Sequence, residues 1–174
     1  VSGETYYYKV MAVRDKAKTS KVGPVSARVK FNKHGIDVSE YQGEIQWKKV
    51  KNDGIDFAML RIVKGRTDAM LTDVRFEEYY KEARKAGIDV GVYRYCYATS
   101  VSEAKKEAKK VLQVLNGRKL EYPVVLDMED YSLLPPECSI DNATRSKMVL
   151  AFKEIIEDAG YEFALYANLN WVNN

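Results

Sequence analysis

Two acidic side chains, Asp127 and Glu129, follow an apolar run and are the residues of this sequence best placed to do chemistry. The run Pro123-Val124-Val125-Leu126 has the composition of a strand buried in a parallel sheet flanked by helices. Residues two apart on a strand point to the same face, so these carboxyl groups lie side by side. Such a pair at the carboxyl end of a barrel strand suggests acid/base chemistry. Solvated loop acids or a helix-capping group remain the alternative for so short a motif.

Strand-like and helix-like segments alternate from residue 35 onward, and this alternation predicts the fold. We expect strands at 35–39, 57–63, 89–98, 123–130 and 163–168, and helices at 45–51, 73–86, 101–115 and 141–158. Strict alternation argues for a parallel sheet with right-handed crossovers. No glycine-rich phosphate loop opens a helix, so an α/β barrel of the TIM type fits better than a Rossmann fold. Such barrels close with eight strands, so we expect an incomplete barrel whose C-terminal strands are missing.

Three other features of the predicted strands are candidates for function. Asp37 ends the first strand and is either catalytic or the cap of the turn that follows; the local pattern favours the cap. Arg61 stands in apolar company on the second strand, so it either pairs with a barrel acid or extends its charge to solvent. Tyr93, Tyr95 and Tyr97 share one face of the third strand, a stripe that suits packing and, at its loop end, sugar stacking.

Residues 1–31 differ from the rest and predict a β-hairpin. The run Thr5 to Arg14 and the alternating run Val25 to Phe31 resemble the last two strands of a fibronectin type III domain, of the immunoglobulin-like sandwich class. We therefore expect two parts, 1–31 from such a sandwich and 34–174 as the barrel. The alternative is an N-terminal hairpin that packs on the barrel itself.

The overall composition excludes several classes of function. The chain has 174 residues, of which 46% are hydrophobic and 30% charged, and its net charge of +3 is too weak and too interspersed for nucleic-acid binding. His34 is the one histidine and the two cysteines lack metal-ligand spacing, so we expect no metal and no cofactor. Cys96 and Cys138 either pair or stay separate thiols. No apolar run approaches the length of a membrane span.

Several motifs, in matching order and spacing, resemble the glycoside hydrolase family 25 lysozymes. The opening Gly35-Ile36-Asp37-Val38-Ser39, followed by Tyr41-Gln42-Gly43, is similar to the first strand and turn of that family. The segments that resemble its later strands are 57–61, 91–98, 123–130 and 166–168. The resemblance spans roughly residues 34–172. One departure is Arg94, where the family often has an aromatic residue or histidine; the family also carries a further acid and aromatics on strands beyond Asn174.

The resemblance implies a secreted, cell-wall-associated muramidase on a modified β/α barrel. Such enzymes cut the β-1,4 bond between N-acetylmuramic acid and N-acetylglucosamine, so the implied partner is peptidoglycan, and we expect a monomer. By position, Glu129 would be the general acid/base, Asp127 would orient or stabilise the reacting acetamido group, and Asp37 would line the cleft. The implied substrate-binding residues are Tyr95, Tyr97, Tyr166 and Arg61. A non-catalytic wall-binding module is the alternative, and an adhesive protein built on the hairpin would explain residues 1–31 alone.

Elementary chemistry agrees with these roles. A glycosidic oxygen needs a proton donor, and Glu129 beside Asp127 should hold its proton to higher pH because two like charges resist joint ionisation. Two residues along a strand advance about 6.6 Å. That value falls between the carboxyl separations of about 5–5.5 Å for retaining and about 6.5–9.5 Å for inverting enzymes, so spacing leaves the stereochemistry open. The resemblance implies retention, with help from the N-acetyl group of the substrate.

Overall fold

The computed structural model describes residues 33–129 and 140–167. The chain divides into two units, Val1–Asn32 and Lys33–Asn174, and every described residue belongs to the second. The predicted hairpin at 1–31, with its resemblance to a fibronectin type III domain, therefore lies outside the described residues. The same holds for Asp130 and Cys138.

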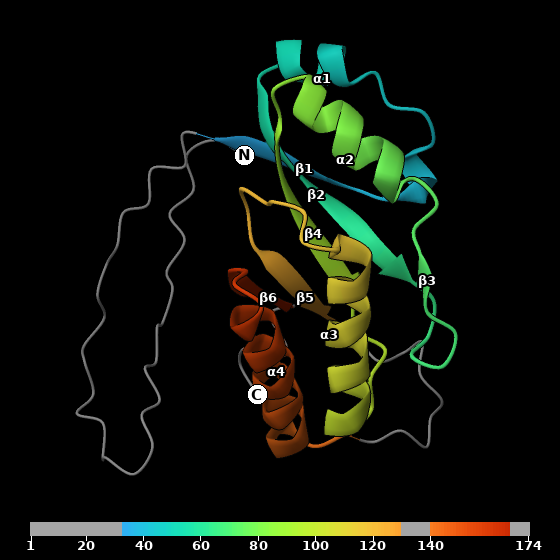
Figure 1. The fold of residues 1–174 in the computed structure, drawn as a ribbon, viewed down its shortest axis with the longest axis vertical. Helices are drawn as coiled ribbons and strands as arrows, with labels where there is room; N and C mark the ends of the chain where they lie inside the picture. Colours follow the sequence, from blue (N-terminus) through green and yellow to red (C-terminus); the bar gives the residue numbers. More distant parts are fainter. Residues whose placement is uncertain (1–32, 130–139, 168–174) are drawn as a thin grey trace, which may run out of the picture. The chain divides into compact units, whose positions relative to one another are not determined.

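Parallel strands in chain order make up the body of the sheet (Figure 1). They are β1 His34–Val38, β2 Ile55–Lys64, β4 Asp89–Tyr95, β5 Val124–Met128 and β6 Phe163–Ala167. Each pairs in parallel with the next. An order that follows the chain is that of a β/α barrel, whereas a doubly wound sheet reverses direction. The predicted parallel sheet is confirmed. The short β3, Leu71–Thr72, runs antiparallel to the end of β2 and was missed, because two residues leave no periodic pattern.

The connecting helices lie where the sequence predicts them. They are α1 Trp47–Asn52, α2 Phe76–Lys85, α3 Val101–Leu115 and α4 Asn142–Asp158, and a 3₁₀ turn, η1, spans Glu40–Gln42. Caps set the starts of the two long helices: the Ser100 hydroxyl accepts a hydrogen bond from the Glu103 N–H at 3.3 Å. At α4, the Asp141 carboxylate accepts one from the Thr144 N–H at 2.6 Å. No described helix is long and apolar enough to cross a membrane.

The two faces of the sheet have different roles. Figure 1 shows α2, α3 and α4 over the same face, and alternate residues such as Ala58, Leu60 and Ile62 of β2 are fully buried beneath these helices. The intervening residues, such as Met59 and Arg61, point to the opposite face, which we call the inner face. Apart from the buried Arg94 and Glu107, the helix-covered core is largely apolar, so the inner face and the loops at the carboxyl ends of the strands are the places for polar chemistry.

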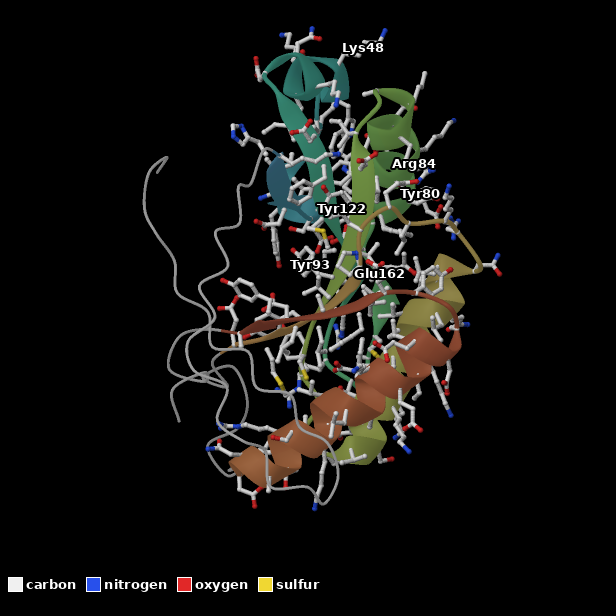
Figure 2. All side chains as sticks on the ribbon, turned by 90° about the vertical axis from the view of Figure 1, so that its left-hand side faces the viewer. Lys48, Tyr80, Arg84, Tyr93, Tyr122 and Glu162 are labelled. Carbon is white, nitrogen blue, oxygen red and sulfur yellow. The ribbon has the colours of Figure 1, made fainter. Side chains whose placement is uncertain are left out.

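A packed floor closes the inner face near the amino ends of the strands. The rings of Phe57 and Tyr122 stack with centroids 4.3 Å apart and an interplanar angle of 14° (Tyr122 is labelled in Figure 2). Gly91 sits beside this floor, since an added Cβ would lie 2.6 Å from the Met59 sulfur and 2.7 Å from the Tyr122 Cβ. Glycine is thus required at residue 91, and the open part of the inner face is its carboxyl end.

Candidate active site

Asp127 and Glu129 lie on the inner face at the carboxyl end of β5. Buried Val124, Leu126 and Met128 point to the helices, so the residues between them face inward. Asp127 belongs to the strand, and Glu129 follows its last residue. In the register of the sheet, Asp127 pairs with Tyr95 of β4 on one side and with Tyr166 of β6 on the other. The Asp127 and Glu129 side chains hydrogen-bond with each other, so the two acids lie side by side as the sequence predicts.

Asp127 holds its proton unusually tightly. Burial is the largest cause, followed by the charge of Glu129, a hydrogen bond with Glu129 and the charge of Asp37; together they raise the pKa of Asp127 to about 7. Its Oδ1 is buried and has no hydrogen-bond partner among the described residues. Asp127 therefore keeps its proton up to about neutral pH, beside the Glu129 carboxyl group. From the sequence we expected Glu129 to hold its proton to higher pH, whereas in the structure burial raises the pKa of Asp127.

Asp37 reaches the same region from the other side of the described sheet. It lies on β1 in register with Met59, a residue of the inner face, and it is exposed. Its negative charge contributes to raising the pKa values of both Asp127 and Tyr93. The expectation that Asp37 caps the following turn is wrong. Ser39 is the cap of η1: it directly precedes Glu40, the first residue of the turn, and its hydroxyl accepts a hydrogen bond from the Tyr41 N–H at 3.4 Å, whereas Asp37 is still within β1.

Tyr93 is a site residue that the sequence placed in the tyrosine stripe but not among the expected substrate-binding residues. Its side chain lies on the inner face of β4 (Figure 2), where it hydrogen-bonds with Ser39. Burial raises the pKa of Tyr93 to about 12, the Arg61 charge opposes this rise, and the charges of Asp37 and Asp127 add to it. Tyr93 is thus a neutral hydroxyl between the acid of β1 and those of β5. Its position in the tyrosine stripe was the available signal, but a stripe suits packing equally well.

Two of the predicted sugar-binding tyrosines, Tyr95 and Tyr166, flank Asp127 in the sheet, and Tyr97 contacts Tyr95. The Tyr95 and Tyr97 rings are in contact, with centroids 4.9 Å apart. Tyr166 is 54% exposed on β6, next to Asp127. One correction concerns the strand that carries the stripe: β4 ends at Tyr95, not at Ala98, so Tyr97 belongs to the connection to α3. Tyr97 therefore depends on other contacts for its position.

Arg61 pairs with carboxylates outside the acid cluster. Its Nε lies 2.7 Å from Asp73 Oδ2 and its Nη2 lies 2.8 Å from Glu40 Oε1. Glu40 also binds Lys64 at 2.5 Å, so this network fixes η1 beside the site. The Arg61 guanidinium lies 4.8 Å from the ring centroid of Tyr41, which is 80% exposed. A substrate-binding role for Arg61 stays a prediction; the contacts shown are those that hold the turn and the Tyr41 ring.

Comparisons with known proteins agree with this geometry. Residues 36–174 match the model of the family described as glycosyl hydrolases family 25. The autolytic lysozyme of Clostridium acetobutylicum is 26% identical over 137 residues, which cover 79% of this chain and 39% of that protein. The modular autolysin LytC of Streptococcus pneumoniae has a TM-score of 0.70 at 26% identity, covering 82% of this chain and 34% of LytC. A lysozyme of Streptomyces coelicolor has a TM-score of 0.67 at 25% identity, covering 80% of this chain and 64% of its own.

A parallel β/α sheet of the barrel type, with paired carboxyl groups at the end of one strand, is the architecture of a barrel glycoside hydrolase. The match over residues 36–174 is more specific: the chain belongs to glycoside hydrolase family 25, the family of lysozymes. The chain spans about two fifths of the curated lysozyme and about a third of LytC. LytC has also been solved with a synthetic peptidoglycan ligand.

Proposed function

We propose that the protein is a muramidase, a peptidoglycan hydrolase that cleaves the β-1,4 bond between N-acetylmuramic acid and N-acetylglucosamine. It would act outside the cell, on the bacterial cell wall. The observation that carries the proposal is the adjacent pair of Asp127 and Glu129 at the end of β5, in which burial and the charge of Glu129 raise the pKa of Asp127 to about 7. A proton donor available at neutral pH is what cleavage of a glycosidic bond requires.

In this proposal, Asp127 passes its proton to Glu129 through the hydrogen bond between them, and Glu129 donates it to the glycosidic oxygen as the bond from that oxygen to the anomeric carbon breaks. Asp127 accepts a hydrogen bond from the acetamido N–H, and the acetamido carbonyl oxygen attacks the anomeric carbon to form a cyclic intermediate. The Glu129 carboxylate then takes a proton from water, whose oxygen opens the intermediate. Two displacements at one carbon retain its configuration, and no protein nucleophile is needed.

The surrounding residues fit a saccharide substrate. Tyr93 presents its hydroxyl between Asp37 and Asp127, where it can hydrogen-bond a sugar hydroxyl. Tyr95, Tyr97 and Tyr166 would form the sugar-binding wall around the acid pair. Tyr41 lies at the β1 side of the sheet, three strand spacings or about 14 Å along it from β5. Its exposed ring would therefore contact a sugar away from the bond that is cut.

The test is the release of new reducing ends from purified peptidoglycan. The parent should release them, and Glu129→Gln should lower the rate at least a hundredfold, because the amide keeps the shape but has no transferable proton. Glu154→Gln, on the exposed side of α4, is the matched control and should act like the parent. Unchanged turnover by Glu129→Gln would exclude the acid role. Binding of insoluble wall by both proteins without release would favour a wall-binding module instead.

A further inference from the structure

A buried ion pair between the sheet and α3 takes no part in the chemistry above. Arg94 of β4 and Glu107 of α3 are both fully buried, and Arg94 Nη2 lies 2.8 Å from Glu107 Oε1. Arg94 points to the helix-covered side, among residues that are otherwise apolar. Arg94 Nε and Glu107 Oε2 have no hydrogen-bond partner among the described residues. A desolvated pair with two unsatisfied polar atoms is a poor source of stability, so its presence calls for another role.

The contacts of Glu107 point to that role. Besides Arg94, its Oε1 accepts hydrogen bonds from the Thr67 hydroxyl at 2.8 Å and from the Tyr97 N–H at 3.1 Å. Thr67 lies in the loop between β2 and β3, and Tyr97 lies in the connection from β4 to α3. One buried carboxylate therefore joins two loops at the carboxyl end of the sheet, the end that carries the proposed site.

Strand geometry explains why the Tyr97 amide needs this partner. The Cys96 N–H donates to the Asp127 carbonyl of β5 at 2.8 Å, so the next amide, that of Tyr97, points the other way, toward β2. The pairing of β2 with β4 ends at Val63 and Arg94, after a shift in register. Glu107 thus takes the place of the missing strand neighbour, and Arg94 reinforces the junction by donating to the Val63 carbonyl at 3.3 Å.

Arg94 also contacts the ring of Tyr97. The Arg94 guanidinium lies 5.2 Å from the Tyr97 ring centroid, and the Tyr95 and Tyr97 ring centroids are 4.9 Å apart. The backbone of Tyr97 is thus fixed by Glu107, and its ring lies between Arg94 and Tyr95. We propose that the Arg94–Glu107 pair is a positioning device that acts through Tyr97 and holds this aromatic ring for an N-acetylated β-1,4 saccharide. The sugar contact rests on the proposed function; the anchoring of the two loops does not.

The test replaces the whole pair, since removing one partner would leave a buried charge unpaired and unfold the protein for an unrelated reason. Arg94→Met with Glu107→Leu keeps the volume and is compatible with folding. We expect the double variant to melt cooperatively, as the parent does. The Tyr97 amide and the amides around Thr67 should exchange with solvent at least tenfold faster. Arg94→Gln with Glu107→Gln also removes both charges but keeps an acceptor oxygen for the Tyr97 N–H, so it should preserve most of the protection of that amide, which separates lost hydrogen bonding from lost charge.

Saccharide affinity supplies the second readout, with the tetramer of β-1,4-linked N-acetylglucosamine as the probe. The double variant should weaken binding about tenfold, and the same change in a Tyr97→Ala background should weaken it less than twofold, because the pair acts through Tyr97. A purely structural pair would give equal effects in both backgrounds, and that result would overturn the proposal, as would unchanged exchange of the Tyr97 amide. If the parent bound no saccharide, the proposed function and the sugar contact would both fail, while amide exchange would still decide the anchoring.

Discussion

Replacement of Asp127 by asparagine should make the folded protein more stable at neutral pH, although it removes a residue of the proposed site. The pKa of Asp127 rises from 3.8 to about 7 on folding, so the native state binds this proton more tightly than the unfolded chain. The resulting stabilisation is complete below about pH 3.8 and is lost as the pH rises through about 7. At pH 8 the parent therefore carries an ionised, half-buried carboxylate that the variant lacks.

The pKa difference, at about 1.4 kcal/mol for each tenfold change, corresponds to about 4 kcal/mol. Asp127 is only partly buried, so solvent screening reduces this figure to about 2 kcal/mol. Relative to the difference at pH 4, the free energy of unfolding of Asp127→Asn should thus exceed that of the parent by about 2 kcal/mol at pH 8. This difference in the free energy of unfolding should develop between pH 4 and 7.

Urea unfolding at half-unit steps from pH 4 to 8 measures this difference, provided that the urea dependence stays the same in both proteins. Glu154→Gln is the control: it also removes one carboxylate, but on an exposed helix face, and should track the parent within about 0.5 kcal/mol at every pH. Curves of the parent and Asp127→Asn that run parallel over this range would refute the claim that folding raises the pKa of Asp127.

Two further predictions concern the inner face. Tyr41→Ala should weaken binding of long N-acetylglucosamine oligomers by about fivefold to tenfold and leave binding of the dimer unaffected, while Tyr41→Phe, which keeps the ring, should bind as the parent does. Calorimetric titration with oligomers of increasing length measures these affinities, and an equal loss for dimer and hexamer would exclude a distant contact. Gly91→Ala should lower the free energy of unfolding by about 1–3 kcal/mol, because the new methyl group overlaps Met59 and Tyr122; urea unfolding decides it, and an unchanged midpoint would show that the floor is loosely packed.

The sequence was informative where one periodic pattern determined both the element and the direction of its side chains. The run from Val124 to Met128 has that property: its alternation sends Asp127 inward, so the acid pair could be predicted before any coordinates. The same is true of α3 and α4, whose caps and lengths follow from Ser100 and Asp141.

Contacts between distant segments were beyond such reasoning. A buried arginine on β4 is understood only when Glu107, one element later, is seen beneath it. The early end of β4 also has a tertiary cause, since β2 parts from it at Val63, whereas residues 96–98 keep strand-like composition. Burial of Asp127 also depends on tertiary packing: the sequence showed two acids close together but not that folding would raise the pKa of Asp127.

The most direct test of the central claim is the identity of the reducing ends released from purified peptidoglycan, determined by borohydride reduction and analysis of the reduced sugars. A muramidase should yield reduced muramic acid alone, and Glu129→Gln should yield none above background. Reduced glucosamine in place of muramic acid would contradict the proposed cleavage site. Equal release by the parent and Glu129→Gln would contradict the role of the acid pair.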